Sequence, residues 1–411
     1  MSATLSKDEQ STPAPLVGLE ERRRVNPLVA ALSRNSMFVA LAAVIVVFTL
    51  TTDGVIVRNQ NVSNVIVQNG YILILAIGMV MVIVGGHIDL SVGSLAGFVG
   101  SVSAVLMVNH HVHWGLAVVL SLVIGAAAGA FQGFWIAYVG VPSFIVTLAG
   151  MLTFRGLTLM VIGPTNIGSF PAGFTKFGSG YLGNPHPGKG VDLLTVILTV
   201  LLVAAIVVTR VRGRMGKKSH GEPVGSPIPF ALGLIALSAA VFALGWALAS
   251  YRGTPMVLVI LLVLAAVYTL IAKRTSLGRY IYAVGGNRRA AELSGINAKR
   301  IVFFLFVNMG LLAALAGLAF TARLNLASSA GGSGFELEAI AAAFVGGAAV
   351  QGGIGTISGA IIGGLTIGVI NNGMSIMGLG AQWQQAVLGL VLLVVVAFDF
   401  WNKKRRGRQS V

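Results

Sequence analysis

The chain has 411 residues, of which 56% are hydrophobic and only 10% are charged, and 28 Lys and Arg against 12 Asp and Glu give a net charge of +16. This composition is far more apolar than that of an average soluble domain, and the absence of cysteine excludes disulfides and thiolate-bound metal. Several apolar runs are continuous over the roughly 20 residues that cross a hydrocarbon core of about 30 Å, unlike the alternating strands of a membrane β-barrel. The sequence therefore predicts an all-α, polytopic transmembrane helix bundle.

The first 35 residues are polar and lack the apolar core of a cleavable signal peptide, so we expect a disordered cytoplasmic segment. Residues 36–401 follow as the predicted transmembrane domain, and residues 402–411 form a basic cytoplasmic tail. The apolar runs predict twelve spans, at approximately 37–52, 65–85, 90–109, 115–139, 143–163, 191–209, 227–249, 254–272, 300–322, 338–352, 357–377 and 383–400.

Most basic residues fall in four clusters, at the N-terminus, in 210–218, in 273–300 and in the tail. Short basic flanks beside spans mark the cytoplasmic side and need no nucleic acid to explain them. Both termini are therefore expected in the cytoplasm, which requires an even number of spans. Three glycines interrupt 338–377, which can form two spans or a broken helix, so ten spans is the alternative. The loop 164–190 then lies outside, where its Gly, Pro and aromatic residues suit an irregular cap or docking surface.

Glycine is abundant, with 54 residues, and small residues let helices approach closely in lipid. Two stretches repeat glycine at every fourth position and predict helix-packing faces. The residues are Gly125, Gly129 and Gly133 in one stretch and Gly355, Gly359 and Gly363 in the other.

Chemistry-bearing motifs are scarce. The chain has no HExxH zinc site, no recurring carboxylate pair and no phosphate-binding GxxxxGK[ST] loop, so we expect no catalytic residue, no metal, no cofactor and no ATP hydrolysis by this chain. The histidines of "HHVHW" at 110–114 are interpreted as an interfacial turn anchored by Trp114. Passive channel, ion-coupled carrier and subunit of a larger pump remain open, the carrier using Asp89 with His87.

The cytoplasmic segment 275–300 has the pattern of a short amphipathic helix. Ala290, Ala291, Leu293 and Ile296 are apolar, Arg288, Arg289 and Glu292 are charged, and Gly295 is a helix stop. Such a helix suits a groove in a soluble partner.

The same segment, "LGRYIYAVGGN" followed by "AAELSGIN", resembles the coupling loop of bacterial sugar ABC-importer permeases of the ribose/xylose type. Four further blocks, "IDLSVGS", "VPSFIVTLAGMLTFRG", "ELEAIAAAFVGG" and "NNGMSIMG", resemble family blocks in the expected order. The resemblance covers about 37–401 and is closest to the xylose type, which has an extra pair of spans corresponding to about 191–249. Arg289 departs from the family, since many importer permeases carry Glu there, and so does His87, where Gly or Glu is usual.

The resemblance implies a multi-pass permease subunit of a bacterial inner-membrane importer that moves a monosaccharide, xylose or another pentose, into the cytoplasm. Two copies would form the pathway, separate ATPase subunits would supply energy, and an external sugar-binding protein would deliver the sugar. The ATPase-coupling residues would be Asn287, Arg289, Ala290, Ala291, Glu292, Leu293, Ser294, Gly295 and Ile296. Structural or pathway candidates are Asp89, Ser91, Ser94, Arg155, Glu336, Glu338, Asn371 and Asn372.

A carboxylate next to an apolar run is costly, so Asp89 needs a role. The resemblance places it near the cytoplasmic turn between the second and third spans, where it would cap the following helix, with Ser91 and Ser94 as further caps. A sugar-contact role and a proton relay are the alternatives. The relay corresponds to the runner-up function, an ion-coupled secondary sugar carrier, and a non-transporting membrane scaffold is a third possibility.

Overall fold

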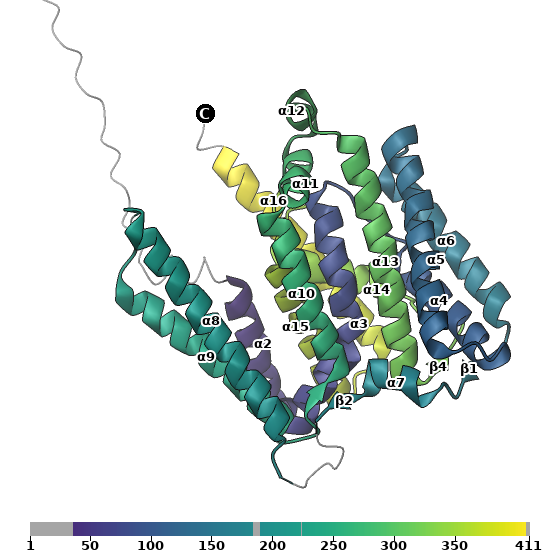
Figure 1. Ribbon diagram of the computed structural model, residues 1–411, viewed down its shortest axis with the longest axis horizontal. Coiled ribbons are helices and arrows are strands. Elements are labelled where there is room, and N and C mark those ends of the chain that lie inside the picture. The colour runs from purple at the N-terminus through teal and green to yellow at the C-terminus, as the bar shows by residue number, and fades with distance from the viewer. Residues whose placement is uncertain (1–35, 184–189, 223, 408–411) are drawn as a thin grey trace, which may run out of the picture.

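The computed structural model describes residues 36–183, 190–222 and 224–407, so the predictions for 1–35 and for the end of the tail lie outside the described residues. The described chain is mostly helical (Figure 1), consistent with the predicted polytopic helix bundle. Its helices are α2 (Ser36–Thr51), η1 (Val55–Val57), α3 (Asn59–Val84), α4 (Val92–Ala104), η2 (Val105–Asn109), α5 (Trp114–Phe134), η3 (Trp135–Val139), α6 (Ser143–Ile162), α7 (Ala172–Ser179), α8 (Leu193–Ser219), α9 (Pro227–Ala249), α10 (Met256–Arg274), α11 (Ser276–Gly286), α12 (Arg288–Leu293), α13 (Ala298–Leu324), α14 (Phe335–Val345), α15 (Ile357–Ile376) and α16 (Ala381–Gly407).

Within the described residues, nine helices are long and apolar enough to cross a membrane: α3, α4 with η2, α5 with η3, α6, α8, α9, α10, α13 and α15. Shorter apolar stretches occupy Met37–Thr51 in α2 and Ala381–Ala397 in α16. Three of the twelve expected spans are therefore not among the nine: 37–52 and 383–400 lie in these shorter stretches, and 338–352 contains a helix that is shorter still. That helix, α14, has 11 residues, which rise only about 16 Å, half the thickness of a hydrocarbon core.

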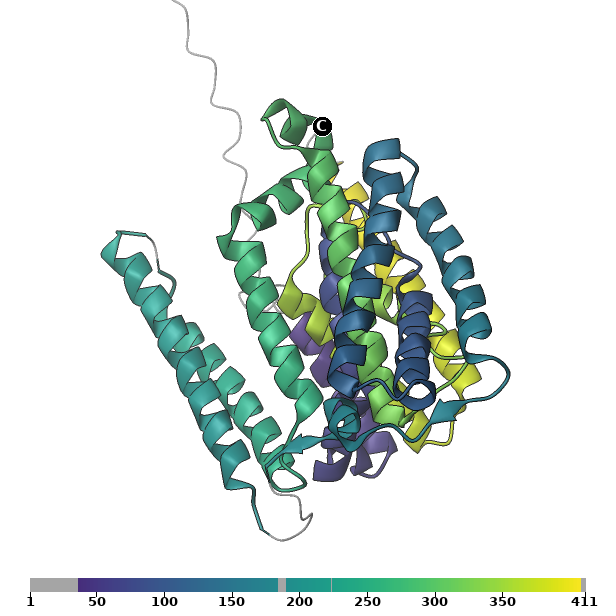
Figure 2. The ribbon, with the colours of Figure 1, turned by 45° about the vertical axis from the view of Figure 1, so that its right-hand side comes forward.

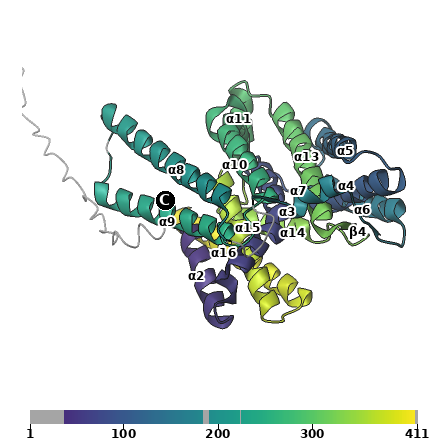
Figure 3. The same ribbon diagram turned by 60° about the horizontal axis from the view of Figure 1, so that its bottom comes forward.

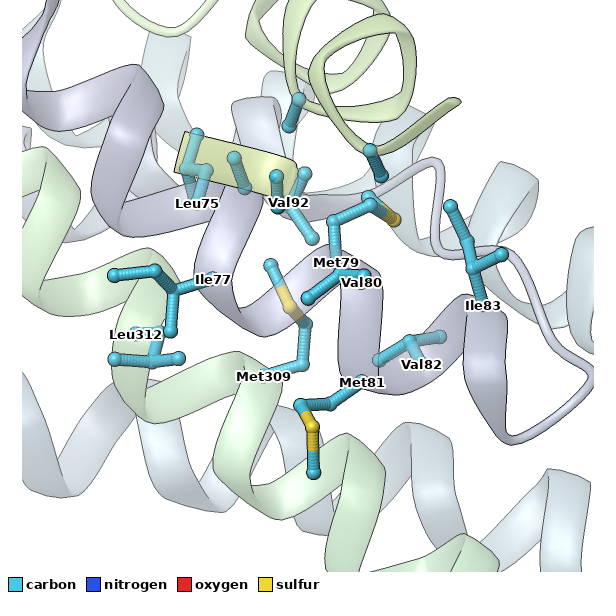
Figure 4. Packing of buried hydrophobic residues seen from close by; sticks show 14 of the residues in the cluster. Leu75, Ile77, Met79, Val80, Met81, Val82, Ile83, Val92, Met309 and Leu312 are labelled. Carbon is cyan, nitrogen blue, oxygen red and sulfur yellow. The ribbon is translucent and has the colours of Figure 1, made fainter. Parts of the chain in front are cut away.

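The helix α3 forms the centre of the bundle and is buried along most of its length. The long helix α13 packs against α3, α4 and α5. Across Gly78 of α3, the side chains of Met309 and Leu312 fill the space that a Cβ would take, and Figure 4 shows both reaching from α13 toward α3. The burial of α3 extends to Val84, its last residue, so the turn that follows begins inside the bundle.

Glycine determines how closely two helix pairs approach. A Cβ on Gly129 of α5 would lie 2.2 Å from the carbonyl oxygen of Phe306 in α13, and one on Gly363 of α15 would lie 2.1 Å from that of Ala342 in α14. Both predicted packing faces are therefore confirmed. Gly355 is a correction, because it precedes α15 and is not helical.

The segment 325–356 is a broken element. Phe335 begins α14 beside Tyr71, midway along α3, with 4.4 Å between ring centroids. After α14 an irregular stretch continues to the end of α3, where the Gly353 N–H donates to the carbonyl oxygen of Val84 at 2.8 Å. Helix α15 then runs back along α3, with Gly364 against Leu73. Residues 338–377 thus contain a half-length helix and one full-length helix.

At the other end of the bundle from α12, the loop 164–183 is tied down by two small sheets (Figure 1). Strand β1 (Ile167–Gly168) pairs with β4 (Leu326–Ala327), and β2 (Tyr181–Leu182) pairs with β3 (Thr254–Pro255), both antiparallel. The Asn325 Oδ1 also accepts a hydrogen bond from the Phe170 N–H at 2.8 Å. The predicted irregular cap is therefore an ordered structure around α7.

Helices α8 and α9 lean away from the other helices (Figures 1, 2 and 3). They pack closely on each other, since a Cβ on Gly245 would lie 2.1 Å from the Thr199 Oγ1. Near β2 and β3 the hairpin is anchored to the bundle by a 2.9 Å hydrogen bond between the hydroxyls of Thr195 and Thr254.

Candidate functional site

The segment from α11 to the start of α13 forms a series of capped short helices at one end of the molecule. Thr275 Oγ1 accepts from the Gly278 N–H at the start of α11, and Asn287 Oδ1 accepts from the Ala290 N–H at 3.0 Å at the start of α12. Side-chain caps satisfy the free N–H groups of a helix start. Gly295 has φ +84°, the left-handed conformation of a helix stop, as the sequence predicted. The caps and the stop therefore define where each short helix begins and ends.

Ala291 does not lie on the partner-facing side of α12, where the sequence pattern placed it. Ala291 is only 4% exposed and belongs to the core of the bundle, with Ile296 packed beside it, so its side chain does not face outward. Leu293 is 84% exposed and Ala290 is exposed as well. An exposed Arg288–Glu292 ion pair of 3.1 Å bridges the helix surface. The outward apolar surface of α12 is therefore Leu293 with Ala290.

Backbone contacts between glycines connect this segment to the bundle. A Cβ on Gly285, at the end of α11, would lie 1.7 Å from the Val84 carbonyl oxygen of α3. One on Gly352 would lie 2.8 Å from the Gly285 oxygen and 3.0 Å from the Gly86 Cα. Gly86 and Gly352 both have φ +84°. We call Gly86, Gly285 and Gly352 the glycine junction; it joins α11, the turn after α3 and the segment that follows α14.

A side-chain bond reinforces the same connection, because the Tyr282 hydroxyl of α11 donates to the Gly355 carbonyl oxygen at 2.6 Å. Sequence reasoning missed the junction. The available signal was the Gly-Gly pair that occurs in each of three apolar-flanked turns, "VGGH", "VGGN" and "QGGI".

Asp89 is 2% exposed in the turn between α3 and α4. Its Oδ1 accepts from the Ser91 N–H at 2.8 Å and from the Ser91 hydroxyl at 2.6 Å. The Ser91 oxygen in turn accepts from the Gln132 Nε2 of α5 at 2.9 Å. Ser91 occupies the N-cap position of α4 and its side chain makes no cap bond, while Ser94 lies inside the helix. The expected caps are thus replaced by an Asx turn that holds the N-cap residue.

The charge state of this turn follows from its burial. Burial raises the pKa of Asp89 to about 6, opposed by the two hydrogen bonds from Ser91. Burial also lowers the pKa of His87 to about 4, assisted by the nearby Arg288 cation. At neutral pH the Asp89 carboxylate is mainly ionised and the imidazole is neutral. Asp89 therefore acts as a hydrogen-bond acceptor that orders the turn.

A second group of polar side chains surrounds the start of α14. The Glu338 Oε1 accepts from the Asn371 Nδ2 of α15 at 3.3 Å, and Glu336 lies against Gly93 of α4. Asn372 belongs elsewhere, since its Oδ1 accepts from Asn61 of α3 at 2.8 Å. The structure thus brings Glu338 and Asn371 together and places Glu336 beside the first turn of α4, whereas Asp89 and Ser91 form a separate hydrogen-bonded group with Gln132.

Arg155, which the resemblance made a structural or pathway candidate, is exposed on α6. A half-buried cation that the sequence analysis missed is Arg323, near the end of α13. It lies over the rings of Tyr71 and Phe320, with its Cζ 5.9 Å and 5.8 Å from their centroids. Its signal was a lone cation directly after the apolar run "LAALAGLAFTA".

The histidine loop shows a structural role. The His113 Nδ1 accepts from the Gly115 N–H at 3.2 Å and caps α5. Among the described residues, no group of three His, Asp or Glu side chains is placed to hold a metal ion.

A comparison with protein families matches the chain, over residues 61–220 and 189–396, to the family described as branched-chain amino acid transport system / permease component. The chain is 41% identical to the xylose transport system permease protein of Escherichia coli (strain K12) over 374 residues, covering 90% of this chain and 92% of the relative. The chain belongs to this permease family. The permease is also 37% identical to the xylose permease of Haemophilus influenzae (strain ATCC 51907 / DSM 11121 / KW20 / Rd), covering 90% and 96% of the two chains.

The ribose import permease protein of Escherichia coli (strain K12) is 34% identical to the permease over 374 residues, or 91% of this chain and 95% of the relative. No solved structure gives a significant match. The resemblance found in the sequence blocks is confirmed over nearly the whole chain. The permease is a multi-pass protein of the bacterial inner membrane and a transport subunit rather than an enzyme.

Proposed function

We propose that the permease is the transmembrane subunit of an ATP-binding-cassette importer that moves xylose or another pentose into the cytoplasm. The observation that carries the proposal is α12, a capped helix with an exposed Leu293, joined through the glycine junction to the broken element. A helix that presents an apolar side chain on a rigid support suits docking into a groove of a soluble partner. The xylose and ribose permeases among its relatives support the substrate class.

In this proposal the chain crosses the membrane twelve times and both termini are cytoplasmic. The stretch 325–356 provides one crossing, with α14 as its helical part, since non-helical backbone at membrane depth is tolerated where protein surrounds it. The basic residues of α8 and of 273–300 support a cytoplasmic location for the α12 end. The end with α7 and the two small sheets then faces outward (Figure 1), where a sugar-binding protein would dock.

Two copies of the permease would form the pathway, and two ATPase subunits would dock on the two α12 helices. ATP binding in those partners would displace α12. The glycine junction would pass the displacement to the segment after α14, because backbones in direct contact cannot move independently. The permease itself performs no covalent step.

The proposal is tested by expressing the tagged permease with the ATPase encoded beside it. We expect a complex of both subunits in detergent, whose ATP hydrolysis rises several-fold when the sugar-loaded binding protein is added. If the permease purifies without an ATPase and transports sugar without ATP, the proposal is wrong.

A further inference from the structure

Three aromatic rings from three helices meet at the start of α14. Tyr71 of α3 lies 4.9 Å from Phe320 of α13 and 4.4 Å from Phe335 of α14, and the two phenylalanines lie 4.9 Å apart, all measured between ring centroids. Tyr71 and Phe320 retain partial exposure in a part of the bundle that is otherwise buried. Aromatic faces of this kind offer an apolar surface with a polar edge at the Tyr71 hydroxyl.

Charged and polar groups border these rings. Arg323 lies over Tyr71 and Phe320, and Glu336, Glu338 and Asn371 lie around the first turn of α14 and beside it. All four side chains are partly exposed rather than sealed in the core. We call Tyr71, Arg323, Glu336, Glu338 and Asn371 the α14 cluster. It combines donors and acceptors from four different helices.

Two atoms of the α14 cluster are buried without a hydrogen bond. The Arg323 Nε and the Glu336 Oε2 have no partner among the residues that the structure describes. Buried polar atoms are nearly always paired, and an unpaired one inside a membrane protein is costly. The Arg323 Nε is a donor and the Glu336 Oε2 is an acceptor. A ligand that forms hydrogen bonds with both atoms must therefore accept from the first and donate to the second.

A sugar ring has this chemistry. Its hydroxyls donate to carboxylates and accept from a guanidinium or an amide, and its C–H face packs on aromatic rings. The ring is uncharged, which suits a cluster that already contains ions of both signs. Resting on the proposed function, we propose that the α14 cluster is a low-affinity contact site for the sugar on its way through the bundle, with Tyr71 and Arg323 as its two principal contacts.

The first test measures sugar uptake by the reconstituted importer with its ATPase and binding protein. The variants Arg323→Gln and Tyr71→Phe each remove one polar contact and keep most of the side-chain volume. We expect each to lower the initial uptake rate ten-fold or more, while copurification with the ATPase stays within two-fold of wild type. The matched controls, Arg252→Gln and Tyr268→Phe, remove a cation over Tyr181 and a tyrosine hydroxyl bonded to Asn308, both outside the α14 cluster, and should leave uptake within two-fold.

The second test measures binding directly and uses the absence of native cysteine. In the purified permease, Asn371→Cys should react with a maleimide at least two-fold more slowly in excess xylose than in excess sorbitol. Ser358→Cys, exposed on the same helix, should react equally fast in both. If Arg323→Gln does not fold, the labelling result alone tests whether the sugar contacts the α14 cluster.

The outcomes separate the two proposals. Wild-type importer that shows no ATP-driven uptake would contradict the proposed function. Wild-type uptake with both cluster variants within two-fold of it, or equal labelling of Cys-substituted 371 in xylose and sorbitol, would overturn the contact site and leave the importer function standing.

Discussion

Gly285 touches the carbonyl group of Val84 so closely that a Cβ on Gly285 would lie 1.7 Å from the Val84 oxygen. The contact joins α11, which precedes the exposed helix α12, to the central helix α3. Gly352 also contacts Gly285, since a Cβ on Gly352 would lie 2.8 Å from the Gly285 carbonyl oxygen. Backbone contacts at Gly285 therefore join α11, the end of α3 and the broken element without a side chain between them.

This relationship predicts the effect of adding one methyl group. Gly285→Ala should push α11 away from α3, a packing cost of about 1–3 kcal/mol, and should lower ATP-driven uptake at least ten-fold. Gly286→Ala is the matched control, because its Cβ would meet nothing within 4 Å and it makes the same change in helix propensity. Uptake assays on both variants decide. Equal uptake by the two would mean that the Gly285 contact has no part in coupling.

Leu293 is predicted to be the main apolar contact of α12 with the ATPase. Since its side chain is 84% exposed, Leu293→Asn should leave the thermal unfolding temperature of the permease unchanged and reduce copurification with the ATPase at least five-fold. Met215→Asn, which changes a 65% exposed side chain on α8, is the control and should retain the partner. If Leu293→Asn recovers as much ATPase as wild type, Leu293 is not part of the docking surface.

Asp89 is predicted to act as an acceptor rather than as a proton carrier. Asp89→Asn keeps an oxygen that accepts from the Ser91 N–H, so most of the uptake should remain. Asp89→Leu leaves buried Ser91 donors unpaired and should destabilise the fold by about 1–3 kcal/mol, measured as a lower unfolding temperature and lower folded yield. A relay would give the opposite result for Asn, a normally folded permease without transport.

The topology is predicted to place α12 and α7 on opposite sides of the membrane. Ser294→Cys and Ser179→Cys replace exposed serines by residues of similar size in a chain without cysteine. In intact spheroplasts, a membrane-impermeant maleimide should label position 179 and not position 294, and lysis should expose position 294. Labelling of position 294 in intact spheroplasts would mean that α12 lies outside the cell, and the proposed orientation of the chain would be wrong.

Helix positions followed from the sequence because each span is a continuous apolar run bounded by polar or glycine residues, as in α5 and α10. Local conformation followed as well at Gly295, since a helix stop depends on neighbours in the chain. The burial of Ala291 could not be read, because a six-residue helix has too few positions to define an apolar face. Ala291→Trp would therefore disturb internal packing before it reached a partner.

The sequence held signals for single residues of the α14 cluster and the glycine junction, but not for their assembly. Each joins segments that are far apart in the chain, such as Tyr71 with Arg323 or Gly285 with Gly352. Periodicity describes one helix at a time and does not say which helices meet. The polar residues of α14 were found because carboxylates are rare in apolar runs, whereas Tyr71 is unremarkable in its own stretch until the fold brings Arg323 over its ring.

The central claim is that ATPases acting on α12 energise sugar uptake. The direct measurement is the initial rate of labelled xylose uptake into proteoliposomes that contain the permease, its ATPase and its binding protein. We predict uptake that requires ATP on the α12 side and is unchanged when a protonophore collapses the proton gradient. Uptake that proceeds without ATP and stops with the protonophore would contradict the account.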